Sequence, residues 1–259
     1  MKSKLLLVTA TLTAFLATSF HAQAEDPIQI GISGEPYPPF TYKASSGEWT
    51  GFEVDLAFAI CEQMGRTCEI APTGWSGIIP SLNDGRIDLI MNSMSITEQR
   101  QEVIDFSIPY YFTPGAYVAA TDRDLDIPDG LDGLVLGVQA ATTNANYARR
   151  ALRDSGVDIR IYDQAEQVNA DLLSSRLDVI LADQIAMAQF IERDEASAFE
   201  IKDTAPRHEA YGEGIGIGLR QDDDALERDL NAAVRTVINN GTCGRLSEEY
   251  LGTDVCVYE

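Results

Sequence analysis

The segment from Asn92 to Arg100 concentrates residues that could bind a small anion. Ser93 and Ser95 carry hydroxyl groups, and Arg100 carries a planar guanidinium that forms paired hydrogen bonds with a carboxylate. These residue types at this spacing predict a carboxylate site. The same residues also allow a simpler interpretation, in which a capped helix exposes an arginine to solvent.

Two predicted elements would position these side chains. The apolar run from Ile87 to Met91 is typical of a short buried strand. Thr97 can cap a helix that begins directly after it, and Glu98 suits the positive end of that helix. The two serines would then lie on a strand-to-helix loop beside a helix N-terminus, whose free N–H groups favour anions.

A complementary charge is predicted in the second half of the chain. Asp183 follows the apolar strand predicted at 177–181, and ligands of open α/β sheets bind at such strand ends. Its carboxylate could accept charge-assisted hydrogen bonds from an ammonium group, or it could cap the helix predicted at 184–191. Thr142 and Thr143 precede another predicted helix and offer a second anion site.

Three stretches resemble, in order and spacing, the polar amino-acid family of periplasmic solute-binding proteins. These are receptors of ABC importers and include the histidine and lysine/arginine/ornithine binders. The matching stretches are G-F-E-V-D-L from Gly51, S-x-S-I-T-x-x-R from Ser93 to Arg100, and the run from Arg176 to Asp183. The resemblance covers nearly all of the chain beyond its N-terminal segment.

The resemblance implies ligand roles for further residues. Tyr37, in a proline-rich loop, and Trp75 would cover the ligand with their rings by stacking or cation–π contact. Glu53 would face the cleft from the start of a helix predicted at 53–64, and Asp183 would contact the ligand. Without the resemblance, each aromatic could equally be an ordinary half-buried side chain.

Two departures from the family pattern concern side-chain preference. An acidic residue that often contacts the ligand in relatives corresponds here to Gly34, and Glu35 stands one position later. Asn92 replaces a serine that is common in relatives. The aromatic pair and Glu53 nevertheless suit a cationic or flat polar side chain, so arginine, lysine, ornithine and histidine are the expected ligands, with glutamine and ectoine-like zwitterions as alternatives.

The N-terminal segment predicts export. Lys2 and Lys4 precede an apolar run from Leu5 to Leu16, and Ala22-Gln23-Ala24 has the small-x-small pattern of a cleavage site. We expect a signal peptide at 1–24, cleavage after Ala24 and a periplasmic protein. No cysteine lies near the cleavage point, which argues against a lipid anchor.

The formal net charge of −22 disfavours binding to nucleic acid and to anionic membranes. The chain holds four cysteines, Cys61, Cys68, Cys243 and Cys256, all in the exported part. Among three possible pairings we favour Cys61–Cys68 and Cys243–Cys256, which are local in sequence. Free buried thiols are the alternative. No zinc-site spacing is present, so we expect no metal and no cofactor.

Alternating strands and helices predict an α/β fold. The resemblance implies a periplasmic binding protein-like fold, in which a two-strand hinge joins two α/β lobes around the ligand. Lobe 1 would comprise residues 25–113 and the return strand and helices at 210–259, and lobe 2 residues 114–209. The glycine-rich run from Gly212 to Gly218 lacks the following helix of a nucleotide loop.

The sequence therefore predicts a non-enzymatic, monomeric receptor that captures a free amino acid and delivers it to an ABC permease. One alternative is an enzyme on the same fold, of the cyclohexadienyl or arogenate dehydratase type. Such an enzyme would use Arg100 for a carboxylate and would need a general acid in the cleft, which nothing in the sequence selects. A stand-alone ligand-sensing module is the other alternative.

Overall fold

The structure is a computed structural model that describes residues 26–257. The signal peptide predicted at 1–24, with its cleavage point after Ala24, lies outside the described residues. None of the helices in the described part of the chain is long and apolar enough to cross a bilayer.

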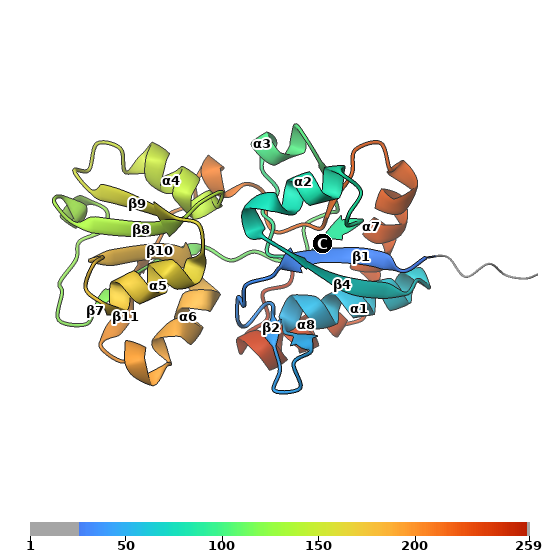
Figure 1. The fold of residues 1–259 in the computed structure, drawn as a ribbon, viewed down its shortest axis with the longest axis horizontal. Helices are drawn as coiled ribbons and strands as arrows, with labels where there is room; N and C mark the ends of the chain where they lie inside the picture. The colour runs from blue at the N-terminus through green and yellow to red at the C-terminus, as the bar shows by residue number, and fades with distance from the viewer. Residues whose placement is uncertain (1–25, 258–259) are drawn as a thin grey trace, which may run out of the picture.

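Two five-stranded sheets organise the chain into the two predicted α/β lobes (Figure 1). The lobe 1 sheet has the order β4-β1-β5-β12-β6, and its strands are β1 (Ile28–Ser33), β4 (Cys68–Thr73), β5 (Leu89–Ile90), β6 (Asp105–Phe106) and β12 (Gly218–Leu219). The lobe 2 sheet has the order β11-β7-β10-β8-β9, and its strands are β7 (Gly115–Ala120), β8 (Val135–Gln139), β9 (Asp158–Tyr162), β10 (Val179–Asp183) and β11 (Phe199–Thr204). A small hairpin of β2 (Tyr42–Lys43) and β3 (Trp49–Thr50) stands apart from both.

Helices cover the two sheets in the usual way for α/β layers. The helices of lobe 1 are α1 (Phe52–Met64), α2 (Ile78–Asn83), α3 (Glu98–Gln101), α7 (Asp224–Asn239) and α8 (Thr242–Leu251), and those of lobe 2 are α4 (Thr143–Ala151), α5 (Ala165–Leu173) and α6 (Gln184–Ile191). Short 3-10 turns lie at Trp75–Gly77, Asp129–Leu131, Asp194–Ala196 and Glu209–Tyr211. In lobe 1, α1 packs against both α7 and α8 although the chain returns to them from lobe 2.

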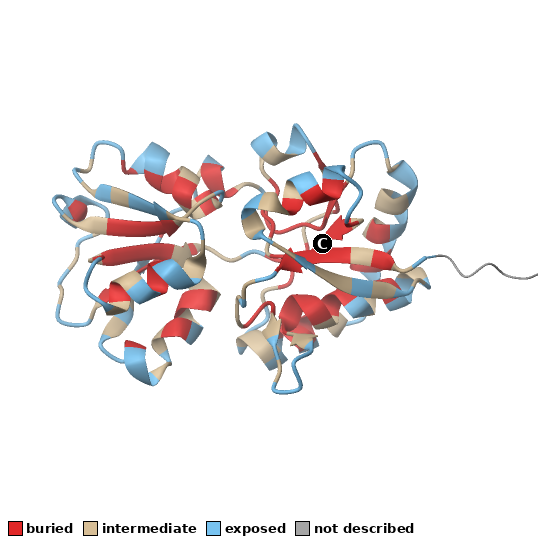
Figure 2. Ribbon diagram, in the orientation of Figure 1, coloured by how far each residue is buried: buried red, intermediate tan, exposed pale blue. Residues whose placement is uncertain are grey.

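The core lies along the sheets and the inward helix faces (Figure 2). Strand β7 is buried over nearly its whole length, because strands pair with it on both edges and helices cover its faces. Such a strand has a continuous apolar run in place of alternation, and the run at 115–120 was not recognised as a strand from the sequence. Strand β11 was also missed, whereas α6 has the predicted bounds 184–191.

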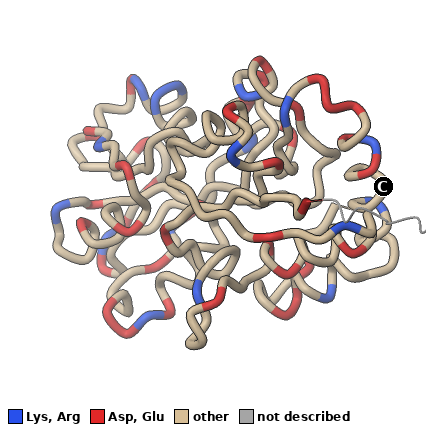
Figure 3. The backbone as a smooth tube through the Cα atoms, turned by 45° about the vertical axis from the view of Figure 1, so that its right-hand side comes forward, with Lys and Arg blue, Asp and Glu red and all other residues tan. Residues whose placement is uncertain are grey.

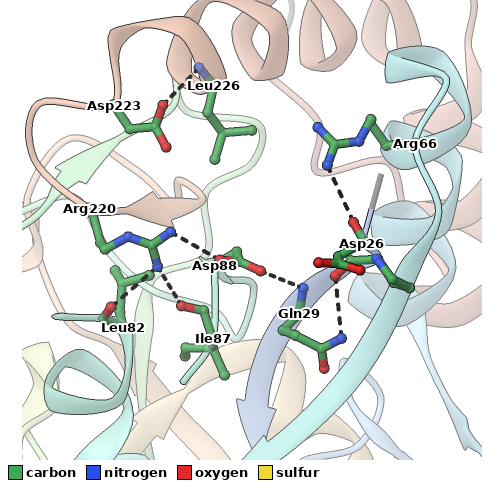
Figure 4. A network of polar contacts seen from close by, with 10 residues as sticks. Asp26, Gln29, Arg66, Leu82, Ile87, Asp88, Arg220, Asp223 and Leu226 are labelled. Carbon is green, nitrogen blue, oxygen red and sulfur yellow. Dashed lines mark hydrogen bonds and ion pairs between the residues drawn. The ribbon is translucent and has the colours of Figure 1, made fainter. Parts of the chain in front are cut away.

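An ion pair between Arg220 and Asp88 links three strands of lobe 1 (Figure 4). The Arg220 guanidinium, just after β12, lies 3.0 Å from the Asp88 carboxylate, which precedes β5. The other carboxylate oxygen of Asp88 accepts the backbone N–H of Gln29 in β1 at 2.9 Å, and Arg220 also donates to the carbonyl of Ile87 at 2.7 Å. The returning chain is thereby fixed to the first part of lobe 1.

Both predicted disulfides are confirmed. Cys61 in α1 is bonded to Cys68 at the start of β4, and Cys243 in α8 is bonded to Cys256 near the C-terminus. The second bond holds the tail against the segment between the lobes, where Val257 donates to the carbonyl of Tyr110 at 3.0 Å.

Two connections run between the lobes, one between β6 and β7 and one between β11 and β12. They pair locally, since Tyr111 of the first forms an antiparallel bridge with Ile215 of the second. The lobe boundaries at 113/114 and 209/210 stay predictions, because the crossing segments have no sharp end.

Candidate ligand-binding site

A cavity with a volume of about 860 Å³, open at its mouth, lies between the two lobes. Nine of the ten predicted ligand residues line it; the exception is Glu53. The nine are Tyr37, Trp75, Asn92, Ser93, Ser95, Arg100, Thr142, Thr143 and Asp183. Residues more than 140 positions apart in the sequence thus face one space.

Arg100 lies in α3, which Thr97 caps as predicted, with its hydroxyl accepting the backbone N–H of Arg100 at 3.4 Å. The guanidinium donates to the carbonyl of Ser95 at 2.8 Å and, across the cleft, to the carbonyl of Ala141 at 3.0 Å. It also lies 5.7 Å from the centre of the Trp75 ring. Burial lowers the pKa of Arg100 to about 10, so it is still a cation at neutral pH.

Glu53 lies behind the cavity wall, where it is only 1% exposed. Its carboxylate accepts the Ser93 backbone N–H at 2.6 Å and the Ser93 hydroxyl at 3.1 Å, and it also accepts the Tyr110 hydroxyl. The expectation that Glu53 faces the cleft therefore has to be corrected. Near the start of α1, the Glu53 side chain points to the loop that holds Ser93. Ser93 lines the cavity and Glu53 does not.

This buried network fixes the shape of the serine loop. Ser93 has a left-handed backbone with φ 51°, which is costly for a residue other than glycine. The hydrogen bonds to Glu53, and a further bond from the Tyr111 hydroxyl to the Ser93 hydroxyl at 2.8 Å, hold that conformation. Burial raises the pKa of Glu53 to about 7, against the opposing effect of the hydrogen bonds from Tyr110 and Ser93.

Asp183 lies at the end of β10 and faces the cavity from lobe 2. One carboxylate oxygen caps α6 by accepting the backbone N–H groups of Ile185 at 2.8 Å and Ala186 at 3.1 Å. The other accepts the hydroxyl of Thr113. The two roles considered for Asp183 are therefore compatible, because one carboxylate can cap the helix and still line the cavity. Burial raises its pKa to about 6, so it is mostly ionised at neutral pH.

The N-terminus of α4 adds polar groups from lobe 2. The Thr142 hydroxyl is engaged inside the protein, since it caps Ala145 at 3.1 Å and donates to the carbonyl of Gln139 at 2.7 Å. Thr143 is 8% exposed and lines the cavity, yet its hydroxyl has no partner among the described residues. Of the two predicted threonines, Thr143 thus has the free hydroxyl.

Tyr37 and Trp75 both line the cavity from lobe 1. Trp75 also reaches the other lobe, because its indole N–H donates to the carbonyl of Ala140 at 3.1 Å. A third contact between the lobes runs from the Gln164 amide to the Glu35 carboxylate at 3.0 Å. Together with the Arg100–Ala141 bond, these contacts draw the two lobes together over the cavity.

Sequence reasoning missed several lining residues. They are Phe112, Thr113, Gln139, Asn144, Glu166 and Tyr211, together with smaller or backbone contributors. Gly115 lines the cavity because the backbone passes close to lobe 2 side chains there: a Cβ would lie 2.4 Å from the Asn144 side-chain oxygen. Phe112 and Thr113 lie in the aromatic and proline-bearing segment 105–114, whose composition is the sequence signal that could have found part of this set.

The cavity places a cation and an anion on opposite lobes, Arg100 on lobe 1 and Asp183 on lobe 2. This arrangement matches a small molecule that carries a carboxylate and an ammonium group. Among residues 26–257, no group of three or more histidine, cysteine, aspartate or glutamate side chains is arranged to hold a metal ion.

Comparison with known proteins agrees with this geometry. Residues 28–253 match the family of bacterial extracellular solute-binding proteins, family 3. The L-arginine-binding protein of Pseudomonas aeruginosa is 33% identical over 97% of this chain and 98% of its own, and the lysine/arginine/ornithine-binding periplasmic protein of Escherichia coli is 31% identical over 98% and 99%. The solved structure of an ancestral arginine-binding protein bound to arginine superposes with a TM-score of 0.81 at 28% identity, over 88% of this chain and all of that one.

Proposed function

Because the chain belongs to family 3 of the bacterial extracellular solute-binding proteins, we propose that it captures a free α-amino acid by closing its two lobes around it. The observation that carries the proposal is the facing pair of charges, Arg100 and Asp183, in one cavity between the lobes. The ligand carboxylate binds Arg100, Ser95 and the N-terminus of α4. The ligand ammonium group binds Asp183.

Closure follows from the placement of the two charges. A zwitterion held by Arg100 alone would contact one lobe, whereas a zwitterion held by both residues stabilises the closed arrangement. Binding therefore shifts an equilibrium between open and closed forms, a hinge motion known in binding proteins of this architecture.

The ligand side chain lies between the rings of Tyr37 and Trp75. Flat or cationic groups gain most from such a pair of rings. Glu35, which lines the cavity, supplies a carboxylate near the same space. Arginine, lysine, ornithine and histidine are therefore the first ligands to test, and the names of the two relatives point to the same group.

The cellular context is part of the proposal. The protein acts in the periplasm after cleavage of its signal peptide behind Ala24, as a monomer, and it delivers the amino acid to the permease of an ABC importer. Support comes from the family, from a relative named periplasmic, and from the basic and apolar N-terminal sequence.

The dehydratase alternative has weaker support. The relatives that the chain matches are named as binding proteins and not as enzymes. The carboxyl group best suited to proton transfer, Glu53, lies behind Ser93 and does not line the cavity.

The test is calorimetric titration of unfolded and refolded mature protein with single amino acids, beginning with arginine, lysine, histidine and glutamine. Refolding removes any ligand retained through purification. One-to-one binding of an α-amino acid supports the proposal. Absence of binding to every common amino acid, together with turnover of prephenate or arogenate, would move the protein to the enzyme class.

A further inference from the structure

A second cavity lies beside the proposed ligand cavity and extends into lobe 2. Its volume is about 590 Å³, and Tyr37, Gln139 and Asn144 line both cavities. We call it the lobe 2 compartment and define it by its inner wall, made of Val168, Asn169, Leu181, Ala186, Met187 and Phe190. These residues come from α5, β10 and α6 of lobe 2, and Pro36, Tyr37 and Pro38 of lobe 1 complete the lining.

The wall is almost entirely apolar and belongs to the protein interior. Leu181 and Phe190 are each 1% exposed and Met187 is 3% exposed, yet all three line open space. Apolar side chains that line open space lack some of the packing contacts of a close-packed core. A ligand group that fills the compartment would recover these contacts.

Asn169 is the polar exception in this wall. It is 7% exposed, and its side-chain amide has no hydrogen-bond partner among the described residues. Among the described residues, the Tyr117 hydroxyl is the one fully buried side-chain polar atom without a partner, so the unpaired Asn169 amide reaches the open space of the compartment. The amide offers both donors and an acceptor, so a ligand carbonyl could accept from its N–H group, and a ligand amide could also donate to its oxygen.

The charges at the rim favour a neutral ligand group. Glu166 and Arg193 lie at the opening of the compartment and pair with each other at 3.4 Å. The two opposite charges offset each other, so this pair gives the opening no net charge. A charge pushed past them would lose its hydration against Met187 and Phe190 without gaining a partner of opposite sign.

We propose that the lobe 2 compartment binds the far end of a long ligand side chain, one with an aliphatic stem that ends in a neutral amide or carbonyl group held by Asn169. The inference rests on the proposed amino-acid function, since Arg100 and Asp183 would hold the backbone of the same ligand. It extends the ligand class from cationic amino acids to amino acids whose side-chain nitrogen is acylated or carbamoylated.

The test compares L-lysine with Nε-acetyl-L-lysine, which share the α-amino acid group and the four-carbon stem. Titration calorimetry on the wild-type protein should give an affinity for Nε-acetyl-lysine at least equal to that for lysine. In Asn169→Leu, which keeps the side-chain size but removes the amide, the ratio of the two affinities should shift against Nε-acetyl-lysine by roughly tenfold.

Two further variants complete the design. Asn169→Ala only removes atoms and should shift the ratio in the same direction, which keeps the test valid if the leucine variant fails to fold. Asn239→Leu makes the leucine change at an exposed asparagine in α7, in the other lobe, and should leave both affinities within twofold of the wild type.

The outcomes separate this inference from the proposed function. Lysine binding with an affinity for Nε-acetyl-lysine more than tenfold weaker would overturn the inference and leave the receptor function intact. An unchanged ratio in both Asn169 variants would overturn the role of Asn169 in the same way. Failure of every α-amino acid to bind would instead overturn the proposed function, and the inference with it.

Discussion

Arg100 uses part of its guanidinium inside the protein and keeps the rest for a ligand. Two of its nitrogens donate to the carbonyls of Ser95 and Ala141, while five N–H groups are present on the side chain. These two bonds orient the planar group before any ligand arrives. Ser95 and Thr143, whose hydroxyls have no partners among the described residues, complete the surroundings of the ligand carboxylate.

We predict that Arg100→Ala largely abolishes amino-acid binding. A buried, hydrogen-bonded charge pair that loses one partner costs roughly 2–5 kcal/mol, or about 30-fold or more in Kd. Titration calorimetry measures the loss. Arg86→Ala removes an equally long cation from an exposed pair with Asp84 and serves as the matched control. If the affinity of Arg100→Ala stays within a few-fold of the wild-type affinity, Arg100 does not bind the ligand.

Glu53 contacts Ser93 and does not line the cavity. Because Glu53 is buried, we expect the stability of the folded protein to depend on pH. The pKa of about 7 lies above the ordinary value of 4.5. Between pH 4.5 and 7, the Glu53 carboxyl group is therefore more protonated in the folded protein than in the unfolded chain. Stability should fall as the pH rises from about 4.5 through 7, by up to roughly 3 kcal/mol.

Glu53→Gln is the variant that isolates this effect. Its side chain does not ionise, so the difference in unfolding free energy between wild type and variant should change across this pH window. Denaturant unfolding of ligand-free protein at several pH values measures it. A difference that stays constant from pH 4.5 to 8 would show that Glu53 titrates normally.

Short elements position the site residues, and elements distant in the sequence hold these short elements in place. Helix α3 has four residues and could not form alone, because helix nucleation is costly. The serine loop before it depends on Glu53 from α1 and on Tyr110 and Tyr111 from the first crossing segment. That segment in turn is paired with the tail, through Tyr111 and Cys256.

We predict that removal of the Cys243–Cys256 disulfide weakens both the fold and the site. The double variant Cys243→Ser/Cys256→Ser should lose about 2–4 kcal/mol of stability, as usual for a native disulfide. Calorimetric unfolding measures this loss. Ligand affinity should fall as well, because the tail no longer holds the Tyr110 segment behind the serine loop.

The disulfide Cys61–Cys68 provides the comparison. It closes a shorter segment, with a sequence separation of 7 against 13, and joins α1 to an edge strand away from the crossing segments. Its removal should lower the melting temperature with a smaller effect on affinity. Equal effects on affinity from both double variants would contradict the proposed route through the tail.

The whole molecule is an acidic pair of lobes with a cavity between them. Aspartate and glutamate are spread over both lobes and outnumber the basic residues, as Figure 3 shows. A negative surface favours the approach of cations and disfavours nucleic acid. The cleft itself is closed by three contacts between lobes: Trp75 with Ala140, Arg100 with Ala141 and Glu35 with Gln164.

The contact between Gln164 and Glu35 allows a test of closure, because Gln164 lines neither cavity. We predict that Gln164→Ala weakens amino-acid binding about fivefold by destabilising the closed form, since a lost hydrogen bond is worth roughly 1 kcal/mol. Titration calorimetry and X-ray scattering would measure affinity and the decrease in radius of gyration on binding. Gln189→Ala, at an exposed glutamine of α6 in the same lobe, is the control. Unchanged affinity in Gln164→Ala would mean that this contact does not contribute to closure.

The sequence alone determined the local features: the apolar runs that contain β5 and β10, the cap of α3 by Thr97, the helix 184–191, and the two disulfides between nearby cysteines. It also determined the family, because each of the three matching stretches is contiguous in the sequence. These features depend on neighbours along the chain, where residue type and spacing suffice.

Only the tertiary structure decided how residues from distant segments meet. It placed Glu53 behind Ser93 and not in the cavity, it added Tyr211 and Thr113 to the lining, and it opened the lobe 2 compartment around Asn169. The physical reason is that these positions depend on the packing of one element against another. An acidic side chain near a helix N-terminus can point into a cleft or pack beneath a loop, and the sequence pattern is the same in both cases.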